Sequence, residues 1–238
     1  VQPDSTLQQP RFMVTLRKIG HDRRTRGFFF FLSLATLSAW MQDAILEPFG
    51  ADVFAMPAGR TTRFNSYWQV ATVIFLSGAM NLWRKRPPER QSTITSRGLS
   101  IMAVGMLLLS LLSMTQQPDL TELSLLIYGA GFGLYTFGGL SLMAVMSSDK
   151  EAGAYLGLWT LSILVFKGLG TFLGGALRDL FFLSMGLPAN ISYGLIFAIS
   201  ALGLIGSILI LVRVDVLGFA RDAGRVISRV EAQTAGAD

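Results

Sequence analysis

The sequence contains no cysteine and a single histidine, His21, among its 238 residues. Without cysteine the chain cannot form a disulfide, an iron–sulfur cluster, a haem–thiolate bond or a cysteine–zinc site. One histidine likewise excludes a metal site built from several imidazoles. Composition alone therefore removes several classes of redox and metal chemistry.

Charged residues are also scarce. They make up 15% of the chain, against about 25% in a typical soluble domain. Hydrophobic residues make up 51%, and the mean hydropathy is +0.50. The apolar residues are gathered into blocks of about twenty, the length that a helix needs to cross a hydrocarbon core of about 30 Å. The sequence therefore predicts an all-α, polytopic membrane protein.

Six apolar blocks predict six transmembrane helices, at about 27–47, 62–83, 98–115, 123–146, 153–180 and 192–212. Together they form a predicted transmembrane domain at 27–214, between a basic arm at 1–26 and a polar tail at 215–238. The arm is weakly amphipathic, which fits a helix lying on the membrane surface and equally a solvated segment. The first block is too long for the core of a signal peptide, so we expect a membrane span there.

Lysine and arginine are distributed unevenly between the two sides of the predicted bundle. Sixteen of the twenty lie in the arm, the tail and the loops on the same side as these ends. Cytoplasmic loops carry an excess of Lys and Arg, so both termini are predicted to be cytoplasmic. This topology accounts for the basic pI of about 9.9, and we expect no nucleic-acid binding.

Polar residues interrupt the end of the first apolar block. Gln42, Asp43 and Glu47 follow Trp40, and Pro48 comes next. On a helix, Asp43 and Glu47 would share one face, and Pro48 predicts that this helix ends at Glu47. Ionisable groups within an apolar run are costly in lipid and indicate a function. The alternative is that they only anchor the helix end near the interface.

A lysine lies deep in the fifth block. Lys167 is about 21 Å and Asp43 about 24 Å from the cytoplasmic ends of their helices, at 1.5 Å per residue. We therefore expect an Asp43–Lys167 ion pair, or a water-filled cavity that holds both, because pairing offsets the cost of burying charge. By the same reasoning Arg178 and Asp179 are candidates to pair with Glu47, as a second site or as a simple salt bridge at the helix end.

The fourth and fifth blocks are rich in glycine, including the pair Gly170 and Gly174. Such spacing favours close packing of helices, and it would also permit bending or close approach of a flat ligand. The run 129–133, Gly-Ala-Gly-Phe-Gly, lies inside an apolar span, so it is no nucleotide-binding loop. No nucleophile with a base, phosphate loop or metal cluster is evident, and we expect no enzymatic activity.

The polar stretch carries a family resemblance. Residues 41–50 read Met-Gln-Asp-Ala-Ile-Leu-Glu-Pro-Phe-Gly. This resembles the Gln-Asp-x-x-Leu-Glu-Pro-Tyr-Gly motif of the bacteriochlorophyll-delivery family, the PucC and LhaA branch of the major facilitator superfamily. Phe49 stands where that family often has Tyr, and Ala51 where it often has Gly.

Weaker elements of the family follow in the same order. Thr61-Thr62 precede Tyr67-Trp68, residues 174–179 read Gly-Gly-Ala-Leu-Arg-Asp, and Tyr193-Gly194 open the last block. The resemblance covers nearly the whole chain, but only the second half of the family's twelve helices. It implies half of a major-facilitator-type bundle whose N-terminal six helices are a possible missing partner. The motif positions Gln42, Asp43, Glu47, Arg178 and Asp179 become candidate site residues, and Lys167 joins them on depth alone.

The resemblance also implies a function and a ligand. The expected role is non-enzymatic delivery of chlorophyll or bacteriochlorophyll, or assembly of pigment–protein complexes in a photosynthetic membrane. Photosystem, reaction-centre or light-harvesting subunits would be the partners, beside the lipid bilayer. A pigment magnesium in mid-membrane would need an oxygen ligand, which suits a hard cation. Two alternatives stay open: half of a proton-coupled transporter for a small solute, and a structural subunit bound to a photosystem or light-harvesting complex.

Overall fold

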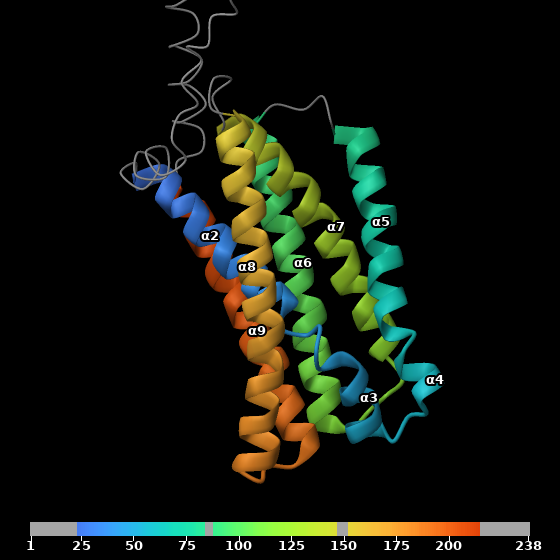
Figure 1. Cartoon of the computed structure of the whole chain (residues 1–238). Coiled ribbons are helices and arrows are strands. Elements are labelled where there is room, and N and C mark those ends of the chain that lie inside the picture. Colours follow the sequence, from blue (N-terminus) through green and yellow to red (C-terminus); the bar gives the residue numbers. More distant parts are fainter. Residues whose placement is uncertain (1–22, 84–87, 147–151, 215–238) are drawn as a thin grey trace, which may run out of the picture.

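The computed structural model describes residues 23–83, 88–146 and 152–214 (Figure 1). Nearly all of the predicted basic arm, including His21, and all of the predicted tail lie outside these ranges. Within them the chain is helical. The elements are α2 (Arg23–Trp40), α3 (Leu46–Phe54), α4 (Ala58–Thr61), α5 (Phe64–Trp83), α6 (Pro88–Thr115), α7 (Thr121–Met146), α8 (Ala152–Arg178), the π-helix η1 (Asp179–Ser184) and α9 (Ala189–Arg213).

Four of the described helices are long and apolar enough to cross a membrane. These candidate spans are Ser92–Thr115, Thr121–Leu142, Trp159–Ser184 and Ala189–Arg213. The apolar part of α2, Arg26–Trp40, is shorter, and α5 has 20 residues but carries several amides along its length. The all-α polytopic class is therefore confirmed. Six complete crossings remain a prediction.

The first predicted span is not one continuous helix. Helix α2 ends at Trp40, residues 41–45 form a turn, and α3 begins at Leu46. The prediction that Pro48 ends the helix at Glu47 is therefore wrong. Pro48 lies in the first turn of α3, where its missing N–H has no partner to lose. Asp43 and Glu47 consequently do not share a helix face.

Side chains from distant helices produce this break. In a continuous helix the Asp43 N–H would donate to the Ala39 carbonyl. Instead the Tyr128 hydroxyl of α7 donates to the Ala39 carbonyl at 2.6 Å, and the Asp43 N–H donates to Trp40 at 3.1 Å. The Ser200 hydroxyl of α9 donates to the Ser38 carbonyl at 2.7 Å. Tertiary contacts thus satisfy carbonyl groups in the last turn of α2, which can end inside the bundle.

The long helices pack in a defined series. Helix α6 packs against α7 on one side and α9 on the other, α5 packs on the outer side of α7, and α2 lies between α9 and α8. Helices α5 and α8 therefore stand at the two ends of the series, with few contacts between α8 and α7. Figure 1 shows α8 in front and α5 at the edge of the bundle. The largest fully buried side chains are Tyr128, Tyr193, Phe31, Phe49, Phe64 and Phe197.

Glycines allow α8 and α2 to approach backbone to backbone. A Cβ atom added at Gly170 would overlap the Leu37 carbonyl oxygen, and one added at Gly174 would overlap the Met41 carbonyl oxygen. Gly129 packs in the same way against the backbone of Trp68, where α7 meets α5. The packing interpretation of the glycine-rich blocks is therefore confirmed at these positions.

Replacing Gly174 with Ala should destabilise the folded protein, because the new methyl group and the Met41 carbonyl cannot both keep their places. We expect a loss of about 1–3 kcal/mol, the usual cost of overpacking. The measurement is the midpoint of unfolding in a detergent mixture. The matched control is Gly175→Ala, because a Cβ there meets no atom within 4 Å. Equal midpoints for the two variants would contradict the close contact.

Candidate functional site

The break between α2 and α3 buries an amide. The Gln42 side chain is 1% exposed. Neither its nitrogen nor its oxygen makes a hydrogen bond of good geometry to the described residues, although the Tyr128 hydroxyl lies beside it. A buried polar group left without a partner costs about 1–3 kcal/mol. Such a cost, carried at an interruption of a helix within the bundle, is typical of a functional position rather than of a stabilising one.

Lys167 and Asp43 lie near the same break but do not form the predicted direct ion pair. The Lys167 Nζ atom lies 3.7 Å from the centroid of the Trp40 ring. The Asp43 Oδ2 atom accepts a long hydrogen bond of 3.5 Å from the Thr171 hydroxyl. No carboxylate of the described residues lies within 4.0 Å of Lys167. Helix α8 places Lys167 and Thr171 one turn apart, so both side chains face the break.

Glu47 makes a contact that sequence reasoning missed. Its Oε1 atom accepts a hydrogen bond of 3.2 Å from the Asn65 side chain, at the start of α5. Asn65 in turn accepts a hydrogen bond of 3.1 Å from the Trp68 indole. This relay connects α3 to α5. Arg178 pairs with Asp52 and Asp179 rather than with Glu47, so the predicted Glu47–Arg178 pair is wrong.

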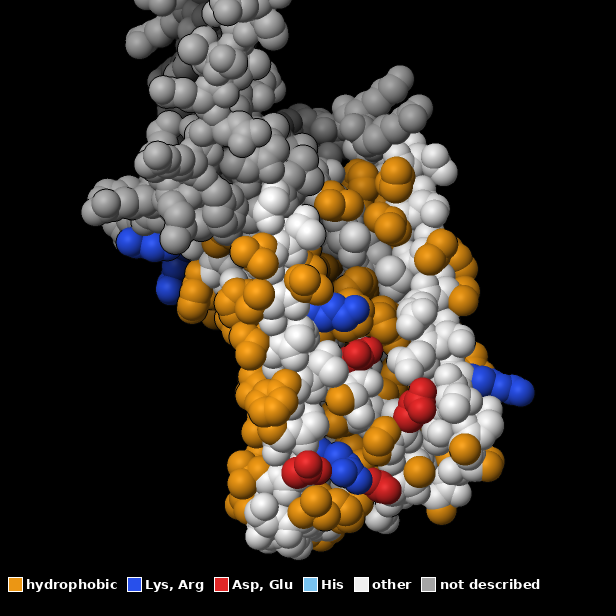
Figure 2. All heavy atoms as spheres, viewed as in Figure 1, with side chains coloured by type: hydrophobic (Ala, Val, Ile, Leu, Met, Phe, Trp, Pro, Cys, Tyr) orange, Lys and Arg blue, Asp and Glu red, His pale blue; other side chains and the backbone are white. Residues whose placement is uncertain are grey.

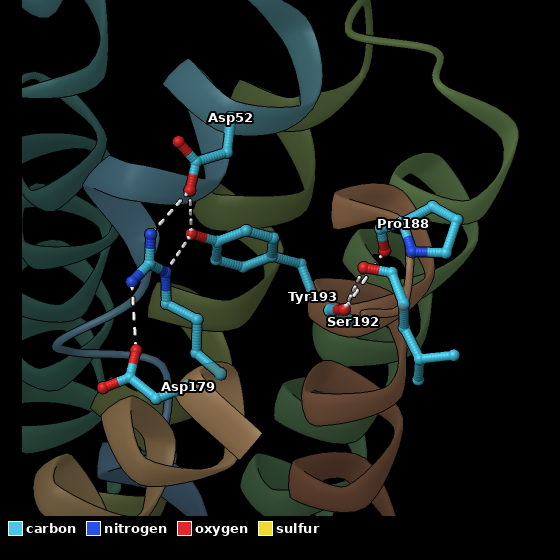
Figure 3. Close-up of polar contacts among 7 residues, drawn as sticks. Asp52, Asp179, Pro188, Ser192 and Tyr193 are labelled. Atoms are coloured by element: carbon cyan, nitrogen blue, oxygen red, sulfur yellow. Dashed lines mark hydrogen bonds and ion pairs between the residues drawn. The ribbon is translucent and has the colours of Figure 1, made fainter. Parts of the chain in front are cut away.

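Arg178 instead anchors a network between α3, α8 and α9 (Figure 3). Its guanidinium lies 2.9 Å from Asp52 Oδ2 and 3.1 Å from Asp179 Oδ1, and its Nε donates to the Tyr193 hydroxyl at 2.6 Å. The Tyr193 hydroxyl donates to Asp52 at 2.6 Å. Asp52 lies five residues after Glu47 in α3, and this helix places it beside Arg178.

An aromatic cluster lies beside these polar groups. Trp40 packs edge-on against Trp68 and Phe132, each with ring centroids 5.8 Å apart. Tyr128 and Tyr135 extend the cluster along α7. Trp40 and Phe132 are only half-buried, whereas Trp68 and Tyr128 are buried. The cluster therefore has an inner packed layer and an outer layer that can contact a bound molecule.

The polar groups form one charged face. We use this name for Lys167, Asp43, Glu47, Asp52, Arg178 and Asp179. Figure 2 shows acidic and basic side chains gathered along a hollowed face between α8 and α5. Within the described residues no group of three His, Asp or Glu side chains is placed to hold a metal ion. Aromatic rings flanked by an ammonium group, carboxylates and an amide suit a flat, largely apolar ligand that carries a few oxygen atoms.

The chain is similar to known proteins over most of its length. The family model described as "PUCC protein" matches residues 2–219. The chain is 26% identical over 205 residues to the "Bacteriochlorophyll synthase 44.5 kDa chain" of Rhodobacter capsulatus, covering 81% of this chain and 45% of that protein. It is 27% identical over 186 residues to "Protein PucC" of Rhodobacter capsulatus, covering 74% of this chain and 39% of that protein.

A further relative is "Protein PucC" of Rhodovulum sulfidophilum, 26% identical over 164 residues, with 65% of this chain and 34% of that protein covered. The chain thus spans less than half the length of these relatives. No solved structure matches it significantly.

The Arg178 network predicts unequal effects for its two carboxylates. Asp52→Asn should lower the free energy of unfolding by about 1 kcal/mol, because Asp52 accepts from both Arg178 and Tyr193. Asp179→Asn is the control and should cost under about 0.5 kcal/mol, since the Asp179 side chain is 60% exposed and bonds Arg178 alone. Unfolding in a detergent mixture measures both. A larger loss for Asp179→Asn would contradict this geometry.

Proposed function

Because this chain belongs to the PucC family, we propose that it holds chlorophyll or bacteriochlorophyll while pigment–protein complexes of a photosynthetic membrane are assembled. It acts as a non-enzymatic membrane protein in this role. Its partners would be subunits of a light-harvesting complex, reaction centre or photosystem. One relative takes its printed name from bacteriochlorophyll, which supports the choice of pigment class.

The observation that carries this proposal is the half-buried aromatic layer next to the break. Trp40 and Phe132 offer ring surface to a flat macrocycle, while Lys167 and Asp43 offer polar contacts at its edge. Pigment is the cargo here, and these side chains supply its surroundings.

The charged face also supports a proposal about the rest of the protein. The curated relatives are more than twice as long as the part that this chain matches. We propose that a second six-helix half, of the major-facilitator type, covers the face between α8 and α5 and encloses the ligand between two bundles. The proposed orientation places both termini in the cytoplasm, with the Arg178 network at the opposite end.

One structural observation favours a second candidate function, half of a proton-coupled transporter. Asp43 lies in an interruption between two helices and Glu47 lies just after it, which is where secondary transporters place their ion and substrate sites. Proton uptake by liposomes that contain the protein would favour this function. Stoichiometric recovery with a reaction centre or antenna would instead favour a structural subunit.

The test of pigment handling is the absorption spectrum of the protein purified in mild detergent from pigment-producing cells. We expect bound pigment in the native protein and a loss of at least about half of it in Trp40→Leu, because aromatic side chains that a bound partner covers carry much of the binding energy of such sites. Trp40→Phe keeps an aromatic ring and should retain more pigment. Phe172→Leu is the matched control, since Phe172 on α8 is 68% exposed.

Two results would contradict the proposal. Pigment-free native protein would exclude stable pigment handling by this chain. Equal pigment in Trp40→Leu and Phe172→Leu would remove the aromatic layer from the site. The elution volume in size-exclusion chromatography identifies any variant that has lost its fold.

A further inference from the structure

The Lys167 ammonium group has a single described contact, with an aromatic ring. It lies in the interior of the candidate span Trp159–Ser184, and its side chain is half-buried. The Trp40 ring provides a cation–π contact at 3.7 Å. No oxygen of the described residues accepts a hydrogen bond from Nζ, and no described carboxylate lies within 4.0 Å.

The cation–π contact does not offset the cost of placing the Lys167 charge within a membrane span. A lysine at the centre of a membrane helix is costly to insert. A single cation–π contact returns less than this cost. Asp43, in the break, accepts only a long hydrogen bond of 3.5 Å from Thr171 and lies more than 4.0 Å from the Lys167 Nζ atom. The ammonium group therefore keeps its hydrogen-bonding capacity for something outside these residues.

The position of Lys167 indicates which kind of molecule would supply a hydrogen-bond acceptor to its ammonium group. The Trp40 ring lies under the ammonium group. The same ring also packs edge-on against Trp68 and Phe132 of the aromatic cluster. Lys167 Nζ lies over the face of the Trp40 ring, so the acceptor that suits it is an oxygen atom at the edge of a flat ring that contacts this layer. The edge of a chlorophyll-type macrocycle carries oxygen atoms: ring carbonyl groups and a propionate side chain, which is either a free acid or an ester.

We propose that Lys167 is a specificity-determining residue that binds an oxygen atom at the edge of the pigment ring. This inference rests on the proposed pigment function and adds to it the residue that distinguishes one pigment form from another. Both the carboxylate of a free propionate and a ring or ester carbonyl present the required acceptor. A carboxylate gains more, because in a low-dielectric site it forms a full ion pair with the ammonium.

The test is a binding titration with two forms of one magnesium tetrapyrrole, the free propionic acid and its methyl ester. Absorbance of the pigment in detergent reports binding to the purified full chain. The variants are Lys167→Met, which keeps the length of the side chain but removes the charge, and Lys167→Arg, which keeps the charge. Leu169→Met is the matched control, because it introduces the same residue at a 43% exposed position on the same helix.

We expect Lys167→Met to weaken binding of the free acid by about tenfold or more, the effect of losing a charged hydrogen bond. Lys167→Arg should recover much of this loss, and Leu169→Met should bind as the native protein does. If only the free acid is affected, the acceptor is the propionate. If both forms are affected equally, it is a carbonyl of the ring.

Unchanged binding of both forms by Lys167→Met would overturn the inference while leaving pigment handling intact. Failure of the native protein to bind either form would instead refute the proposed function, and this inference with it. Removing a charge from an apolar span should not unfold the protein. A monodisperse elution profile for Lys167→Met confirms that its binding can be compared with that of the native protein.

Discussion

The interruption of the first long helix depends on contacts that α7, α8 and α9 make with the last turn of α2 and the residue after it. Gly170 and Gly174 allow the two backbones to meet at Leu37 and Met41. From the other side, Tyr128 and Ser200 donate hydrogen bonds to carbonyl groups in the last turn of α2. The helix can therefore end within the bundle without leaving those carbonyls unsatisfied. The turn that follows brings Gln42 and Asp43 into the interior, and α3 then carries Asp52 to Arg178.

Much of the fold could be predicted from the sequence, because apolar blocks of this length have few alternatives to helices in a membrane. The glycine spacing also indicated close packing, and the α8–α2 contact confirms it. The break in the first block could not be predicted in the same way. Its cause lies in Tyr128 and Ser200, about ninety and one hundred and sixty residues away along the chain. Pro48 predicted a helix end at Glu47, but it lies in the first turn of α3, where proline is tolerated.

The candidate site was predicted as a set of residues but not as a set of contacts. Five of the six singled-out side chains lie along the charged face and the sixth, Gln42, is buried, yet their partners differ from those expected. Arg178 pairs with Asp52 rather than Glu47, Glu47 bonds Asn65, and Lys167 rests on Trp40. The error followed from assuming a continuous helix, which would have placed Asp43 and Glu47 on one face. Once α3 is a separate helix, each carboxylate meets a different neighbour.

This arrangement gives the charged face two functional parts. Where α3, α9 and η1 meet the end of α8, charged groups are paired with one another, as the Arg178 network shows (Figure 3). Near the break, the Gln42 amide and the Lys167 ammonium lack such partners among the described residues, and they border the half-buried aromatic layer.

Because the chain lacks cysteine, this division can be tested with single introduced thiols. The direct measurement is pigment retention after methanethiosulfonate modification of Thr171→Cys, which faces the break, and of Phe172→Cys, which is exposed on the same helix. Modification at position 171 should release pigment and modification at 172 should not; equal retention would contradict a ligand site at the break.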